Sequence, residues 1–158
     1  MNSSTDFLEF FRIDPSQLSV TERYFKHKII PEYNECVLTH SNRLCLITLG
    51  PDHPILKENI DVVSVKFISD RNVDRLSNKV SGKFKKGGQR LSEKSVLCTV
   101  KCSNECEYKI YSCVSGTLVE VNENLINNPN LLKVKPWAEG YIGIILPPFP
   151  WKKHKNVS

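Results

Sequence analysis

The pattern of apolar and turn-forming residues between positions 112 and 146 constrains the fold more than any other part of the sequence. Its first part alternates apolar and polar residues, which is typical of a half-buried strand, and Gly116 suits a bulge or a close backbone approach. At Asn122 the pattern changes to a short amphipathic turn, which this residue could cap and which Pro129 interrupts. The β-formers at 141–146 predict a second strand that ends before two prolines. The block therefore predicts strand, helical corner, loop and strand.

The rest of the chain also favours short strands over helices. The expected strands cover residues 36–40, 43–49, 61–68, 96–101 and 107–112. Residues 21–33 predict instead a short helical segment that Thr21 could cap and that Pro31 ends. With 158 residues, 40% of them hydrophobic, the chain is long enough for one core.

The tripeptide Val-Ser-Gly occurs twice, beginning at Val80 and at Val114, each time before a run of β-formers. Two copies are too few for a solenoid, which needs at least three repeats to bury a continuous core. The repeated tripeptide therefore favours a pseudo-symmetric closed β fold.

A first resemblance concerns the carboxyl-terminal third of the chain. The runs V-S-G-T-L-V-E-V-N-E-N-L, N-N-P-N-L-L and E-G-Y-I-G-I-I-L resemble the closing half of the glycine cleavage H protein, the lipoyl-carrying relative of biotinyl domains. The resemblance implies an all-β fold with one or two short helices, a barrel-sandwich hybrid or β-hammerhead. In such domains two similar halves wrap a flattened barrel, and a hairpin between them carries the modified lysine.

The lysine that a lipoyl carrier needs is poorly matched. Val100-Lys101 can be laid over the Val-Lys of the H proteins, but the return strand to Val-Ser-Gly is then four residues too long. Counting back from Gly116 without a gap puts Glu105 at the acceptor position. We expect no cofactor and interpret Lys101 as a solvated strand lysine. A lipoyl carrier modified on Lys101, or on Lys109, is the alternative.

A second resemblance is wider and runs from about Arg23 to Leu146. The runs R-Y-F, T-H-S-N-R-L-C-L-I-T-L with H-P-I-L, and N-K-V-S-G-K-F-K-K-G with the following Leu91 resemble the Abitram (Simiate) family. This resemblance implies a non-enzymatic protein that binds monomeric and filamentous actin and modulates filament assembly in filopodia. It also implies residence in nuclear speckles and in the cytoplasm, including actin-rich projections. A longer carboxyl-terminal tail is expected in that family.

The charge of the chain favours acidic partners. Its formal net charge is +5 and its pI is near 8.9. The residues predicted to contact a partner are Lys83, Lys85, Lys86 and Arg90, together with Lys152, Lys153 and Lys155 in the tail. The alternative is a solvated hairpin that keeps a sheet edge from pairing. A nucleic-acid-associated nuclear scaffold stays open, although the aromatic strands of RNA-recognition domains are missing.

Residues for catalysis, metal binding or membrane insertion are not evident in the sequence. Glu120 and Glu123 sit at a strand end and a corner, which is a poor setting for a catalytic pair, and no phosphate-binding loop is present. The cysteines closest to one another are Cys98, Cys102, Cys106 and Cys113. Their spacing lacks the paired knuckles of zinc sites, so we expect buried thiols and no metal. No apolar run approaches the ~20 residues of a membrane span, and we expect an intracellular chain with no membrane partner.

Three segments are expected along the chain. A Phe-rich arm covers residues 1–20, the H-protein-like β domain covers 21–148, and a basic aromatic tail covers 149–158. The arm would either pack on its own domain or dock a partner.

Overall fold

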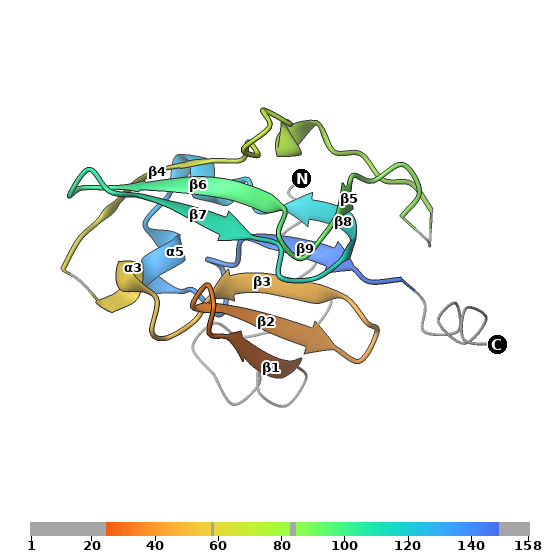
Figure 1. Cartoon of the computed structure of the whole chain (residues 1–158), viewed down its shortest axis with the longest axis horizontal. Coiled ribbons are helices and arrows are strands. Elements are labelled where there is room, and N and C mark those ends of the chain that lie inside the picture. Colours follow the sequence, from red (N-terminus) through yellow and green to blue (C-terminus); the bar gives the residue numbers. More distant parts are fainter. Residues whose placement is uncertain (1–24, 58, 83–84, 149–158) are drawn as a thin grey trace.

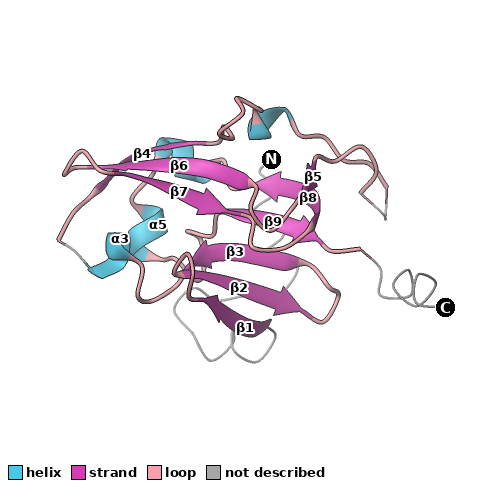
Figure 2. Cartoon of the chain, in the orientation of Figure 1, coloured by secondary structure: helices cyan, strands magenta, loops and turns pink. Residues whose placement is uncertain are grey.

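Two antiparallel sheets make up most of the computed structural model, which describes residues 25–57, 59–82 and 85–148 (Figure 1). A six-stranded sheet has the order β1-β2-β3-β9-β8-β5, and a three-stranded sheet has the order β4-β6-β7. The strands are β1 Phe25–Ile30, β2 Glu35–His40, β3 Cys45–Leu49, β4 Val62–Lys66, β5 Arg90–Leu91, β6 Val96–Cys102, β7 Glu107–Tyr111, β8 Gly116–Val121 and β9 Gly143–Leu146. The helices are α3 Pro54–Lys57, α4 Asn124–Asn127, α5 Leu131–Val134 and the 3-10 turn η1 Arg75–Ser77. Figure 2 shows how little of the described chain is helical.

The main core lies between the two sheets. Ile47 and Leu118 from the larger sheet join Leu97, Val100 and Ile110 from the smaller one in a single apolar cluster, and all five are fully buried. Alternation along each strand turns every second side chain toward this layer, which is why the sequence pattern has a period of two. Removing this apolar surface from water is the main force that holds the two layers together.

The six-stranded sheet is apolar on its other face as well. Leu38, Leu46 and Ile144 are register partners across β2, β3 and β9, and they belong to a second buried cluster. Tyr141 completes this cluster and donates its hydroxyl to Oε1 of Glu120 at 3.0 Å. Burial on both faces explains why apolar residues follow one another directly in these strands, as Val37 and Leu38 do in β2 and Leu46 and Ile47 in β3.

Asn122 organises the corner between β8 and β9. Its side-chain Oδ1 accepts from the backbone N–H of Asn124 at 3.2 Å, but the N-cap of α4 is Glu123, so the capping position predicted from the sequence is off by one residue. Its Nδ2 also donates to the carbonyl oxygens of Glu139 at 2.7 Å and Tyr141 at 2.8 Å. This buried amide therefore ties the helical corner to the start of the last strand.

The predicted fold class is confirmed, as are the strands expected between residues 36 and 146, within two or three residues at their ends. The helical segment expected within 21–33 is wrong, because residues 25–30 form β1 in full register with β2. Pairing with a neighbouring strand overrides the local helix signals there. Thr21 lies outside the described residues.

The two Val-Ser-Gly copies have different structures. Gly82 has a φ of +75° in a tight turn, whereas Gly116 opens β8. A Cβ on Gly116 would lie 2.4 Å from the carbonyl oxygen of Leu146, so this glycine permits close strand pairing. Among the described residues, the larger sheet ends at β1 and β5 and the smaller sheet ends at β4 and β7. Both sheets are therefore open, whereas the repeated tripeptide predicted a closed one.

Candidate functional site

The β6-β7 hairpin is the position at which a lipoyl carrier would present its lysine. Lys101 lies within β6 as the register partner of Glu107, and Lys109 lies within β7 opposite Thr99. The backbone N–H of Cys102 donates to the carbonyl of Cys106 at 3.0 Å and closes the hairpin. No lysine lies among the tip residues 103–106, and Glu105 occupies the turn with a φ of +66°. The residues at this tip do not fit a lipoyl group.

Residues 79–90, here called the basic hairpin, project from the outer edge of the six-stranded sheet (Figure 1). Ser81 and Lys86 form an isolated antiparallel bridge with two backbone hydrogen bonds of 2.9 Å. The side chains of Lys79, Lys86 and Arg90 are exposed, while Lys85 is half-buried. The sequence contains no Asp or Glu from position 75 to position 92, so this projection is uniformly basic. The structure thus gathers three of the predicted contact residues on one segment.

Four predicted contact residues lie outside the described part of the chain. These are Lys83, in the basic hairpin, and Lys152, Lys153 and Lys155. That these four residues contact a partner stays a prediction.

A frame of buried and half-buried polar side chains fixes where the basic hairpin leaves the sheet. The Nε and Nη2 atoms of Arg75 donate to the carbonyl of Val96 at 3.1 and 2.9 Å, and Nη1 donates to Oε1 of Gln89 at 2.7 Å. Asn78 accepts from the backbone N–H of Gln89 at 2.7 Å and donates to the carbonyl of Leu118 at 2.9 Å. Burial lowers the pKa of the Arg75 guanidinium from its usual range. Together these contacts clamp both ends of the hairpin against β8.

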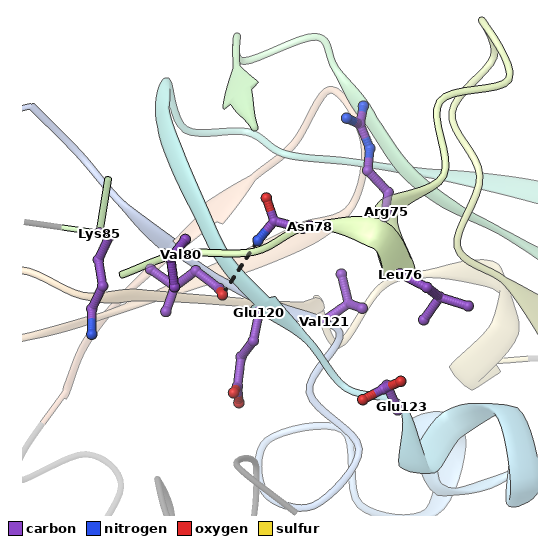
Figure 3. Close-up of a pocket in the computed structure, with 9 residues that line it drawn as sticks. Arg75, Leu76, Asn78, Val80, Lys85, Glu120, Val121 and Glu123 are labelled. Atoms are coloured by element: carbon purple, nitrogen blue, oxygen red, sulfur yellow. Dashed lines mark hydrogen bonds between the residues drawn. The ribbon is translucent and has the colours of Figure 1, made fainter. Parts of the chain in front are cut away.

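A groove of about 360 Å³ opens between this frame and β8 (Figure 3). Its lining residues are Arg75, Leu76, Asn78, Val80, Lys85, Val119, Glu120, Val121 and Glu123. Tyr141 holds the half-buried Glu120 by its hydroxyl, and Glu123 is exposed just before α4. The groove therefore has a mixed lining, with apolar side chains, two carboxylates on one side and Lys85 at one end.

A buried carboxyl group lies at the start of β2. Oε1 of Glu35 accepts from the backbone N–H of Tyr111 at 2.8 Å, and Oε2 lies 3.0 Å from Sγ of Cys113. Burial raises the pKa of Glu35 to about 8, which these hydrogen bonds only partly offset. Burial and the neighbouring carboxyl raise the pKa of the Cys113 thiol. A thiol that resists ionisation is a poor nucleophile, so this pair has a structural role.

The cysteines do not gather into one site. Cys98 and Cys102 are buried in the main core, while Cys106 is exposed at the hairpin tip. Within residues 25–57, 59–82 and 85–148, no group of three His, Cys, Asp or Glu side chains is placed to hold a metal ion. None of the described helices is long and apolar enough to cross a bilayer.

Sequence reasoning missed the polar frame and the groove. Asn78 and Gln89 lie among turn residues, and nothing local indicates that they meet β8 some 40 positions away, as the bond from Asn78 to Leu118 shows. Glu120 and Glu123 were assigned only to a strand end and a corner, and that setting gave no indication of their position beside Leu76. A contact between residues that far apart in the chain produces no periodic pattern in the sequence.

Comparison with known proteins matches both resemblances. The family model of the glycine cleavage H-protein matches residues 51–155. The chain is 44% identical to Protein Abitram of Bos taurus over 146 residues, which cover 89% of this chain and 78% of the bovine one. It is 36% identical to Protein Abitram of Dictyostelium discoideum over 131 residues, covering 80% of this chain and 71% of the other. The crystal structure of a glycine cleavage system H protein from Mycobacterium marinum superposes with a TM-score of 0.55 at 15% identity, covering 77% of this chain and 83% of that one.

Proposed function

The chain belongs to the family of proteins named Abitram and has the fold of the glycine cleavage H-protein, and we propose that it is a non-enzymatic protein that binds monomeric and filamentous actin and modulates filament assembly. The actin role comes from the family resemblance found in the sequence. The basic hairpin is the observation that supports an actin-binding role for particular residues. Its exposed cations have no Asp or Glu near them in the sequence between positions 75 and 92. Actin is acidic, and complementary charge speeds association and orients the two partners.

The hairpin tip supports a binding role over a carrier role. A carrier must present an acylated lysine at the apex of a short turn, whereas Lys101 and Lys109 are paired strand residues. The domain therefore acts by binding a partner through its surface and not by carrying a lipoyl group. We also propose that the protein resides in nuclear speckles and the cytoplasm, including actin-rich projections, which imaging of a tagged chain tests.

The test reverses the charge of the exposed members of the basic hairpin. Lys79→Glu, Lys86→Glu and Arg90→Glu are combined, and Lys85 is kept because it lines the groove. The combined variant should lose about tenfold or more in affinity for filaments in co-sedimentation at low salt, because each exposed cation contributes about 0.2–1 kcal/mol. Its residual binding should depend less on salt than that of the unmodified chain.

The matched control changes net charge by the same amount elsewhere. Lys26→Glu, Lys28→Glu and Lys109→Glu reverse three exposed lysines on β1 and β7. If filament binding weakens equally in both variants, the effect is due to net charge and not to the basic hairpin. If binding is unchanged in the hairpin variant, Lys79, Lys86 and Arg90 are not part of the actin-binding site. Retention on RNA that collapses with added salt, without actin binding, would favour the nucleic-acid scaffold.

The carrier alternative is tested separately by mass. Intact protein isolated from its own cells, grown with and without lipoate, should show no lipoyl adduct. An adduct on Lys101 or Lys109 would overturn the non-carrier assignment.

A further inference from the structure

Two carboxylates, Glu120 and Glu123, line the groove between η1 and β8, together with the cations Arg75 and Lys85. Glu120 and Glu123 lie along one side of it in Figure 3, and Leu76 and Val80 lie on the other side. Leu76 is 42% exposed, so its apolar surface is accessible to a ligand. An apolar surface with carboxylates at its rim is typical of sites that bind a segment of a partner protein.

The two carboxylates are available to a ligand. Among the described residues, ion pairs join Lys57 to Asp52 and Lys135 to Glu139, and neither involves the groove. Glu120 already accepts the hydroxyl of Tyr141 on Oε1, which orients its carboxylate while leaving acceptor capacity. Glu123 stands at the residue before α4 without a side-chain capping bond.

The walls of the groove are held in place without a ligand. Asn78 bonds to the carbonyl of Leu118, and Arg75 is anchored on Val96. The guanidinium of Arg75 points away from Glu120 and Glu123 in Figure 3 and is occupied by its own partners, so it leaves the acidic side without a neutralising cation. Rigid walls reduce the ordering cost of binding.

We propose that this groove binds a short extended segment of a partner protein in which lysine or arginine residues alternate with leucine, valine or similar apolar residues. In an extended segment, alternate side chains point to opposite sides. The cations then pair with Glu120 and Glu123, while the apolar side chains cover Leu76 and Val80. A volume of about 360 Å³ suits two or three residues of such a segment. Lys85 at one end disfavours a cation there and sets the polarity of the bound segment.

The test uses the full chain, labelled with ¹⁵N, and an acetylated hexapeptide of alternating leucine and lysine. Its counterpart of alternating leucine and glutamate is the negative probe. The basic peptide should shift the amide signals of Leu76, Val80 and Glu120 in a saturable way, and the acidic peptide should not. Glu123→Lys should weaken the basic peptide about fivefold or more at low salt, because it replaces an attraction with a repulsion.

The matched control is Glu107→Lys, which reverses an exposed carboxylate on β7 and gives the same net charge. It should leave the peptide affinity within about twofold, and Leu76→Ser should weaken it through the apolar side alone. Absence of groove shifts at 5 mM peptide, equal binding of the acidic peptide, or equal losses in Glu123→Lys and Glu107→Lys would each overturn the proposal. Filament binding should be unchanged in Glu123→Lys, so failure of this inference is separate from failure of the actin proposal.

Discussion

Replacing the buried Glu35 with glutamine should remove a specific pH dependence of stability. Glu35 is fully buried, and its pKa is raised from 4.5 to about 8 by burial. Between these two values the folded chain holds a proton that the unfolded chain releases. The free energy of unfolding therefore falls as pH rises through this window, by about 1.4 kcal/mol per pH unit.

The size of the effect depends on a second buried group. Burial lowers the pKa of His53 from 6.5 to about 4, so between those values the unfolded chain holds the extra proton and stability rises with pH. The two slopes oppose one another below pH 6.5, and Glu35 acts alone from 6.5 to about 8. The shifted thiols and Tyr33 titrate above this window. We expect the unmodified chain to lose about 2 kcal/mol of stability over that interval.

Urea unfolding measured in half-unit steps from pH 5 to pH 8, with thiols kept reduced, gives the free energy at each pH. Glu35→Gln keeps an acceptor for the backbone N–H of Tyr111 and a polar group beside Cys113, so the variant should fold and its stability should be flat above pH 6.5. Glu32→Gln is the matched control, because Glu32 is an exposed carboxylate three positions away. It should keep the slope of the unmodified chain.

Two results would refute this reasoning. One is a flat profile from pH 6.5 to 8 in the unmodified chain, because a carboxyl with a raised pKa must release its proton there. The other is an equal slope in Glu35→Gln, which would assign the titration to a different group.

Three further substitutions test the backbone packing and the frame that positions the basic hairpin. Gly140→Ala should cost about 3 kcal/mol in urea unfolding, because the new Cβ would lie 2.1 Å from the carbonyl oxygen of Leu131. Gly82→Ala, where a Cβ meets nothing within 4 Å but φ is +75°, should cost only about 1–2 kcal/mol, and a reversed order would contradict the packing argument. Arg75→Met should cost about 1–3 kcal/mol, because the buried carbonyl of Val96 loses its donors. Hydrogen exchange should then speed up between residues 78 and 90, and unchanged protection there would show that the clamp does not hold the basic hairpin.

The strands and the corner were predictable because their signals are local. Runs of β-formers between turn residues mark β2, β3, β6 and β7, and Asn122 marks the start of the corner, although the N-cap of α4 is Glu123. Strand β1 was missed because the residues from Thr21 to Pro31 carry helix start and stop signals, while the pairing that makes them a strand comes from residues 35–40. Pairing between segments is decided by partners that a local window does not contain.

The basic hairpin was predictable as a charge cluster, because five of its positions carry lysine or arginine. Its frame was not predictable, because Arg75, Asn78 and Gln89 have polar side chains whose burial depends on β6 and β8. The burial of Glu35 could not be predicted for the same reason. A glutamate beside a turn normally faces water, and only the packing of β7 above it makes this carboxyl buried.

The two proposed surfaces share a support, and this decides how their tests can be separated. The basic hairpin and the groove both depend on Asn78 and Gln89, so a variant at either residue would disturb both and would not distinguish them. In the described part of the chain, the side-chain hydrogen bonds of Asn78 and Gln89 do not involve Lys86 or Glu123. Effects at sites without shared partners usually add within about 0.5 kcal/mol. Lys86→Glu combined with Glu123→Lys should therefore lose filament binding and peptide binding by the amounts of the single variants. A larger departure would mean that a ligand on one surface changes the other through the clamp at Asn78.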